Sequence, residues 1–220
     1  MFEPAIMEMI GKGILETLYM TLVSTFFSYL FGLPMGVLLV ISDPAGVSPR
    51  PLLNRVLGFF INILRSVPFI ILLLAVIPIT RAVVGSIIGP TAIIPPLVFA
   101  AAPFVARMVE SSLKEVDSGV VEAAQSMGAS TWQIIYKVLL PEALPSLVVG
   151  SAITVTTILG YTAMAGFVGG RGLGDIAIRY GFYRYQADMM FVTVVLLVII
   201  VQVFQEVGMR LAKVSDKRIR

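Results

Sequence analysis

Long apolar runs, free of charged side chains, form the main pattern along this chain. Four runs are long enough to cross a bilayer, and they cover Thr17–Ser42, Ala82–Ala106, Ala143–Gly170 and Met189–Gln205. A fifth run, Ser66–Thr80, reaches spanning length if residues 57–64 join it and Arg65 is tolerated. Because a spanning helix needs roughly 20 mostly apolar residues, the pattern predicts an all-α membrane protein with five transmembrane helices. We expect them at about 17–41, 58–80, 91–107, 144–166 and 189–206.

The composition also indicates an integral membrane protein. Of the 220 residues, 58% are hydrophobic and only 13% are charged, which differs from the usual composition of a soluble domain. Residues 1–12 are expected to form a short external segment, and Glu3 and Glu8 stand where a signal peptide would carry positive charge. We therefore expect the first span to be retained. Residues 13–205 then make one transmembrane domain, followed by a basic tail at 206–220.

Several kinds of chemistry are excluded by the residue types present. The chain has no cysteine and no histidine, which excludes disulfides, thiolate nucleophiles, haem ligation and the usual zinc sites. It has no phosphate-binding loop either, because Gly11-Lys12-Gly13 lacks both the upstream glycine and the following hydroxyl residue. We expect no catalytic residue, no metal ligand and no cofactor in this chain, which is therefore not predicted to be an enzyme.

The distribution of basic residues predicts the orientation in the membrane. With the N-terminus outside, eleven of the 16 Lys and Arg residues fall on the inner side, largely in short segments near span ends. Cytoplasmic loops carry such an excess. The N-terminus is therefore predicted outside and the C-terminal tail in the cytoplasm, where it is interpreted as a topology anchor rather than a lipid-binding element.

Charged residues are scarce inside the predicted spans. No acidic residue lies within any of them, since Glu16 and Glu206 stand at span edges. A proton- or sodium-coupled carrier usually holds its ion with an intramembrane carboxylate, so the sequence weighs against that class. Arg65 and Arg107 are expected near the inner ends of their spans. Long side chains there reach the interface, an interpretation that we favour over a role in substrate binding.

Small residues and prolines shape the first three spans. The first contains GLPMG at 32–36, in which two glycines four apart allow close helix approach and Pro34 removes a backbone donor. Ordinary helix packing is the favoured interpretation. Further prolines in the second and third spans are tolerated only where protein or a cavity satisfies the freed backbone groups.

A polar stretch at 108–142 interrupts the apolar pattern and cannot cross a membrane. Asp117 or Ser118 can cap a first short helix, and Gly128 can end it in a left-handed conformation. A capping-box spacing at Ser130 then opens a second helix, which Pro141 would stop. The sequence thus predicts two short helices that meet at Gly128.

Each of these helices has an apolar face at helical spacing. The residues concerned are Val120, Val121, Ala124 and Met127 in the first helix, and Trp132, Ile135, Val138 and Leu139 in the second. Two interpretations are equally supported by this pattern: an amphipathic connector, or a docking surface in which Ala123, Ala124 and Gly128 present a smooth face to water.

The spacing of residues 122–141 favours docking. Glu122-Ala123-Ala124 is followed after three residues by Gly128, and after nine more by Val138-Leu139-Leu140-Pro141. This resembles the EAA motif of the membrane subunits of binding-protein-dependent ABC importers, with valine in place of isoleucine as the only departure. In that family the segment is the coupling helix, which fits into a groove on the ATP-binding subunit. The resemblance implies that the coupling residues are Glu122, Ala123, Ala124, Gly128, Ala129, Leu140 and Pro141.

The resemblance extends over about 12–205 and is strongest to the methionine-importer branch. The stretches that carry it are INILRSVPFIILL, AAPFVARMVESSLKEV, KVLLPEALPSLV and VGGRGLGDIAIRYGF. It implies the type I permease fold in a bacterial inner membrane, with a second copy of the chain and two cytoplasmic ATP-binding cassette subunits that bind ATP and Mg. It also implies an external lipoprotein that delivers D/L-methionine, and no nucleic acid. A permease for another small amino acid is the alternative, while a membrane scaffold or insertase subunit, or a channel, is less well supported.

The segment GYTAMAGFVGG at 160–170 is the candidate for the translocation pathway. It combines small residues with two hydroxyl groups and a methionine, at Tyr161, Thr162 and Met164. Such residues can line a narrow route for a small, partly apolar solute. Close helix packing at the seam between two copies is the slightly favoured alternative, since small residues commonly serve that purpose.

Overall fold

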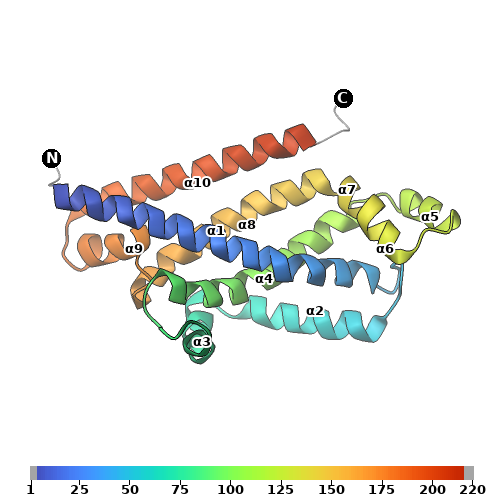
Figure 1. Cartoon of the computed structure of the whole chain (residues 1–220), viewed down its shortest axis with the longest axis horizontal. Coiled ribbons are helices and arrows are strands. Elements are labelled where there is room, and N and C mark those ends of the chain that lie inside the picture. The colour runs from blue at the N-terminus through green and yellow to red at the C-terminus, as the bar shows by residue number, and fades with distance from the viewer. Residues whose placement is uncertain (1–3, 216–220) are drawn as a thin grey trace.

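A computed structural model describes residues 4–215, which fold into helices joined by short connections. Four long helices form the body of the molecule: α1 (Pro4–Ile41), α4 (Pro90–Lys114), α8 (Leu144–Ala165) and α10 (Ala187–Ser215). They extend along the long axis of the molecule (Figure 1). Each contains an apolar stretch long enough to cross a membrane.

Helices α1 and α4 pack closely through the two glycines of the GLPMG segment. A β-carbon at Gly32 would lie 2.6 Å from Val105 Cβ, and one at Gly36 would lie 2.6 Å from Val109 Cβ. Only glycine leaves room for this approach, as in other close-packed membrane helices. Because successive turns of α1 meet successive turns of α4, the two helices run in the same direction.

The predicted second span, 58–80, is not one straight helix. It is divided between α2 (Pro51–Ser66) and α3 (Phe69–Val84), which are bent by 110° relative to each other. The break falls where Val67 takes an extended conformation, with φ −83° and ψ 125°, before Pro68. A residue that precedes proline is disfavoured in the helical region, and proline lacks the N–H needed to continue the ladder.

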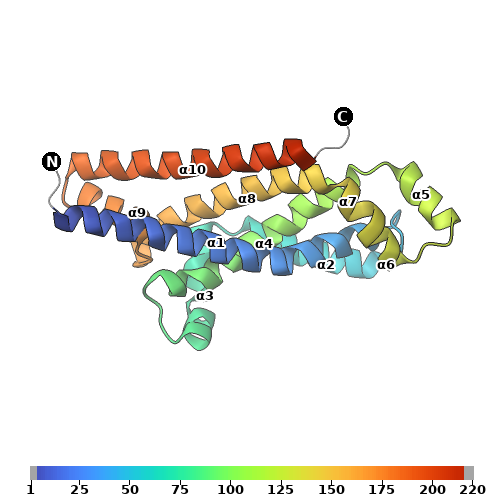
Figure 2. The same ribbon diagram turned by 45° about the horizontal axis from the view of Figure 1, so that its top comes forward.

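Helices α2 and α3 together carry the chain back across the molecule. Because α1 and α4 run in the same direction, the segment between them must return from the end of α1 to the level of Tyr19, whose hydroxyl lies 3.4 Å from Thr91 Oγ1 at the start of α4. Figure 2 shows α2 alongside the long helices and α3 projecting from them. Counted with this bent pair, the described residues contain up to five candidate spans.

Short helices lie at the two ends of the bundle (Figure 1). At one end, between α4 and α8, the structure places α5 (Ser118–Ser126), α6 (Thr131–Ile134), the π-helix η1 (Ile135–Leu139) and α7 (Leu140–Glu142). At the other end, between α8 and α10, it places the 3-10 helix η2 (Gly166–Val168), α9 (Gly172–Ile176) and the π-helix η3 (Ala177–Phe182).

The terminal segments are more helical than the sequence pattern indicated. Residues 4–12, expected as an external segment, are the first turns of α1, and α10 continues through Ser215 into the predicted tail. Glu3 and residues 216–220 lie outside the described residues.

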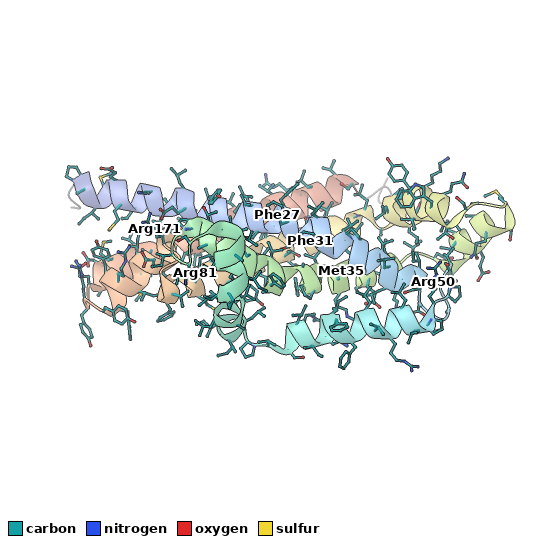
Figure 3. The ribbon with its side chains drawn as sticks, turned by 60° about the horizontal axis from the view of Figure 1, so that its bottom comes forward. Phe27, Phe31, Met35, Arg50, Arg81 and Arg171 are labelled. Carbon is teal, nitrogen blue, oxygen red and sulfur yellow. The ribbon has the colours of Figure 1, made fainter. Side chains whose placement is uncertain are left out.

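Apolar residues cover much of the molecular surface. In the most apolar 18-residue window of α10, 11% of the residues are buried, so most of that window is at least partly exposed in the single subunit. Figure 3 shows Phe27, Phe31 and Met35 along α1, between Arg171 toward one end and Arg50 toward the other. This distribution, apolar in the middle and basic toward both ends, is typical of a protein that spans a bilayer.

Candidate functional site

The first predicted short helix is confirmed, with the caps expected from its sequence. Asp117 Oδ1 accepts a hydrogen bond of 2.7 Å from Gly119 N at the start of α5. At its end, Gly128 N donates to Gln125 O at 2.9 Å and Ala129 N donates to Ala124 O at 3.0 Å. This pair of bonds is a Schellman motif. Gly128 has φ +77°, the left-handed conformation that glycine adopts without steric cost.

The second predicted helix begins at a complete capping box. Ser130 Oγ accepts a bond from Gln133 N, and Gln133 Oε1 accepts one from Ser130 N at 2.8 Å. The expectation that Pro141 ends this helix is wrong, because helical structure passes through the π-helix η1 into α7. The π-helix shifts the bonding pattern, so that Leu140 N donates to Ile135 O, and Pro141 occupies the first turn of α7, where no N–H is required.

One face of this segment packs against the ends of α1 and α4. Ala124, Ile134, Ile135 and Leu139 are buried in one apolar cluster. The members of that cluster from other helices are Val37, Val105, Val109, Leu113 and Ala143. Ala124, which the pattern assigns to the apolar face and the docking interpretation turns toward water, is 5% exposed and lies on the packed side. The segment is therefore fixed to its own bundle by apolar contacts, which accounts for half of its amphipathic pattern.

The rest of the segment is largely exposed. Glu122, Ala123, Gly128 and Pro141 are exposed, while Ala129 and Leu140 are half-buried. Three large apolar side chains of the segment are also exposed: Met127 is 81% exposed, Trp132 72% and Tyr136 68%. Met127 and Trp132 had been assigned to the apolar faces, and Tyr136 had not been singled out. Its spacing of four residues from Trp132 was the available signal.

A groove of about 430 Å³ lies between α5, the segment after α1 and the end of α4. Glu122 and Gln125 line it from α5, and Lys114 and Asp43 line it from the other side. Lys114 Nζ lies 3.1 Å from Asp43 Oδ2 and 3.0 Å from Glu110 Oε1, so these charges tie the end of α1 to α4. The Ala45 N–H and then the Lys114 ammonium hold the pKa of Asp43 below its usual value.

Arg107 links α4 to α2. Its Nη1 lies 2.5 Å from Glu110 Oε2, and its Nη2 donates to Asn62 Oδ1 at 2.8 Å and to Gly58 O at 3.3 Å. The side chain is 26% exposed. The Arg107 side chain was expected to reach the membrane interface. In the structure it instead binds groups of the protein itself, on α2 and α4.

The predicted pathway residues differ in their accessibility. Thr162 is 1% exposed, and its hydroxyl donates to Leu159 O at 2.7 Å. The ring of Tyr161 stacks on Phe69 at the start of α3, with centroids 4.5 Å apart and planes 9° apart. Met164 is 47% exposed. In a single subunit, Met164 and part of Tyr161 are available to a solute, whereas Thr162 is packed inside.

A second polar cluster holds the other end of the bundle together. Gly172 N donates to Glu16 Oε2 at 3.0 Å, and Leu173 N donates to Thr17 Oγ1 at 2.9 Å, which joins α9 to α1. Arg171, at φ +60°, also approaches Glu16, with Nη1 3.8 Å from Oε1. Across residues 4–215 there is no group of three or more His, Cys, Asp or Glu residues placed to hold a metal ion.

Comparisons with known proteins cover nearly the whole chain. Residues 28–220 match the family model described as "Binding-protein-dependent transport system inner membrane component". A probable D-methionine transport system permease protein MetI of Vibrio cholerae is 52% identical, over 92% of this chain and 90% of that protein. The methionine import system permease protein MetP of Bacillus subtilis is 44% identical, over 92% and 91%.

Solved structures agree with the sequence comparisons. The permease chain in an inward-facing structure of the MetNI methionine ABC transporter is 47% identical to this chain, with a TM-score of 0.97. That match covers 98% of this chain and all of the other. The predicted all-helical permease fold is thereby confirmed. The chain belongs to the family of inner membrane components of binding-protein-dependent transport systems, whose members are transport subunits, and within it to the methionine permeases.

Proposed function

We propose that this chain is the permease subunit of an ATP-driven importer of D- and L-methionine. Two copies enclose one translocation pathway in the inner membrane, with the N-terminus outside and the C-terminus in the cytoplasm. ATP and Mg are bound by two partner ATPase subunits, and an external lipoprotein delivers the amino acid. The similarity to methionine permeases over nearly the full chain length supports this assignment.

The exposed face of α5 and α6 is the observation that carries the coupling part of the proposal. Met127, Trp132 and Tyr136 expose large apolar side chains on the same short segment as the exposed Gly128, and other residues of that segment are fixed to α1 and α4. Large exposed apolar side chains on a rigid support are typical of protein interaction sites. An ATPase subunit bound there can transmit its closure to α4 and α8, because α4 precedes the segment in the chain and α8 follows it.

The mechanism that follows is alternating access between two packings of the helices. ATP binding draws the ATPase subunits together, and the bound segments move with them because Ala124, Ile134 and Leu139 are packed into the bundle. A ligand shifts such an equilibrium only by its differential affinity for the two states. In this importer ATP and the loaded binding protein supply that difference, while the permease supplies the pathway.

Reconstitution tests the proposed function. The chain is inserted into liposomes with its ATPase and binding protein, and uptake of labelled L-methionine and D-methionine is measured with ATP on the cytoplasmic face. We expect both isomers to accumulate only when ATP is hydrolysed. Leucine, which is similarly apolar, serves as the matched control solute. Equal uptake of leucine would overturn the methionine assignment, and uptake without ATP would overturn the ATP-driven mechanism.

A further inference from the structure

Arg65 places a positive charge deep in the apolar part of the molecule. It lies in the last turn of α2, which begins at Pro51 beside Arg50, at the end of the bundle that also carries α5 and α6 (Figure 3). The helix rises about 21 Å from Pro51 to Arg65 at 1.5 Å per residue. The hydrocarbon core of a bilayer is about 30 Å thick.

The neighbouring helix α4 gives a similar depth for Arg65. Its neighbour Leu64 lines the same apolar groove as Ala102 of α4. From Ala102 the helix rises about 18 Å to Lys114, which pairs with Asp43 beyond the end of α1. Arg65 therefore lies much deeper than the inner end of a span, where the sequence pattern placed it, because α2 begins seven residues earlier than expected.

The Arg65 guanidinium has no counter-charge within residues 4–215. The side chain is exposed and takes part in no ion pair or hydrogen bond there. The carboxylate on the adjoining α4, Glu110, already binds Arg107 and Lys114. A charge at this depth is costly unless it meets water or an opposite charge.

The exposed side of α2 next to Arg65 is polar. Arg55, Asn62, Arg65 and Ser66 are exposed and fall within one side of the helix. Asn62, at the border with α4, also accepts the bond from Arg107, and Ser66 Oγ donates to Asn62 O at 2.8 Å. The packed side, marked by Ile61 at 2% exposure, lies next to this polar stripe.

A third side of α2 is exposed and apolar. Its centre carries Val56 and Ile63, both 45% exposed, and Phe59 and Phe60 stand at its two borders. A side that faces lipid is expected to be apolar, as this third side is. The polar stripe is instead expected to face a water-filled route.

The polar stripe leads toward the candidate pathway residues. Arg65 precedes the α2–α3 break, and four residues later Phe69 stacks on Tyr161 of α8. Four residues of chain span at most about 14 Å. Arg65 therefore lies near the segment 160–170 in which the sequence placed a pathway.

We propose that Arg65 binds the carboxylate of the transported amino acid as it crosses the membrane. This inference rests on the proposed function, which supplies an α-amino acid as the solute. A planar guanidinium can bind a carboxylate through two parallel hydrogen bonds. The unpaired charge at this depth then has its counter-ion in the solute itself.

Exposure of Arg65 to water is tested with single cysteines in the reconstituted complex. The chain contains no cysteine, so R65C is the only thiol in this subunit. We expect R65C to react with an anionic, membrane-impermeant methanethiosulfonate in the ATP-free complex. The matched control is I63C at the centre of the apolar side of the same helix, which is expected not to react. Failure of R65C to react in ATP-free and ATP-bound states alike would overturn the proposal.

The carboxylate role is tested with R65A and R65K. Hydrogen bonds to charged groups contribute enough that their loss lowers a rate by roughly 10- to 100-fold, so R65A is expected to reduce L-methionine uptake by that factor at unchanged membrane abundance. R65K, which keeps the charge, is expected to recover part of the rate. Uptake by R65A at the unmodified rate would overturn the proposal. If the unmodified complex imports no methionine, the proposed function fails, whereas the labelling comparison still decides whether Arg65 faces water.

Discussion

Gly128 is the residue on which the exposed face of the α5–α6 segment depends. Its φ of +77° allows the Schellman motif that ends α5, and no atom lies within 4 Å of the place where a β-carbon would stand. In the single subunit a side chain there is therefore disfavoured by backbone conformation rather than by contacts. The open space is what a bound partner would fill.

We predict that Gly128→Asp abolishes ATP-driven uptake while the subunit remains in the membrane. The left-handed conformation costs a non-glycine residue roughly 1–2 kcal/mol, too little by itself to unfold the bundle, but the charged side chain projects into the docking face. Uptake by the complex and membrane abundance of the subunit are the two measurements.

Gly128→Asn is the matched control for this prediction. Asparagine tolerates the left-handed region better than most residues, so it reduces the strain and keeps a side chain of the same size without the charge. Loss of uptake in both variants would assign the defect to blocked docking, and normal uptake by Gly128→Asp would contradict the coupling role of this face.

Helix caps and turns were predictable from the sequence, because they depend on residues close together in the chain. The caps at Asp117 and Ser130 and the turn at Gly128 depend on bonds that span at most five residues, and the sequence predicted all three positions, the first as Asp117 or Ser118. Burial was less predictable, because the side of a short helix that packs is set by α1 and α4. Ala124 and Met127 were both assigned to one apolar face, yet Ala124 is buried and Met127 is exposed.

At the scale of helices, the close contact between α1 and α4 holds the bundle in register. A β-carbon at Gly36 would lie 2.6 Å from both Ala106 O and Val109 Cβ. Backbone oxygen cannot move aside as a flexible side chain can, so α1 would have to shift away from α4.

We predict that Gly36→Ala destabilises the subunit by roughly 1–3 kcal/mol, the usual cost of overpacking. The melting temperature of the detergent-purified complex should fall by several degrees. Gly160→Ala is the control, since Gly160 is also helical but has nothing within 4 Å of its β-carbon position. That variant is expected to be neutral or slightly stabilising. Equal melting temperatures for the two variants would contradict the packing argument.

The break between α2 and α3 was the element that the sequence did not predict. Hydropathy averages over a window, and residues 58–80 are apolar enough on average to form one span despite Arg65. The 110° bend depends on Val67 and Pro68 together with the packing of Phe69 against Tyr161, a contact between distant parts of the chain. The resemblance to known permeases predicted the family but not this geometry.

At the scale of the whole molecule, the number of membrane crossings depends on the α2–α3 pair. Four helices are long enough to span individually, and the bent pair is either a fifth crossing or a re-entrant loop. The parallel course of α1 and α4 requires the pair to return the chain across the bundle, and the start of α1 and the end of α10 then lie at opposite ends of the molecule (Figure 1). The distribution of basic residues predicts that the C-terminal end lies in the cytoplasm.

We predict that Lys12→Cys is labelled from outside intact cells and that Lys213→Cys is labelled only after permeabilisation. Both lysines are exposed, and the absence of native cysteine removes background from this subunit. A membrane-impermeant maleimide, followed by quantification of the labelled subunit, provides the measurement. Labelling of both positions from the same side would show that the α2–α3 pair does not cross, and labelling in the reverse order would overturn the orientation. The second result would also place the α5–α6 face outside the cell, where no ATPase could bind it.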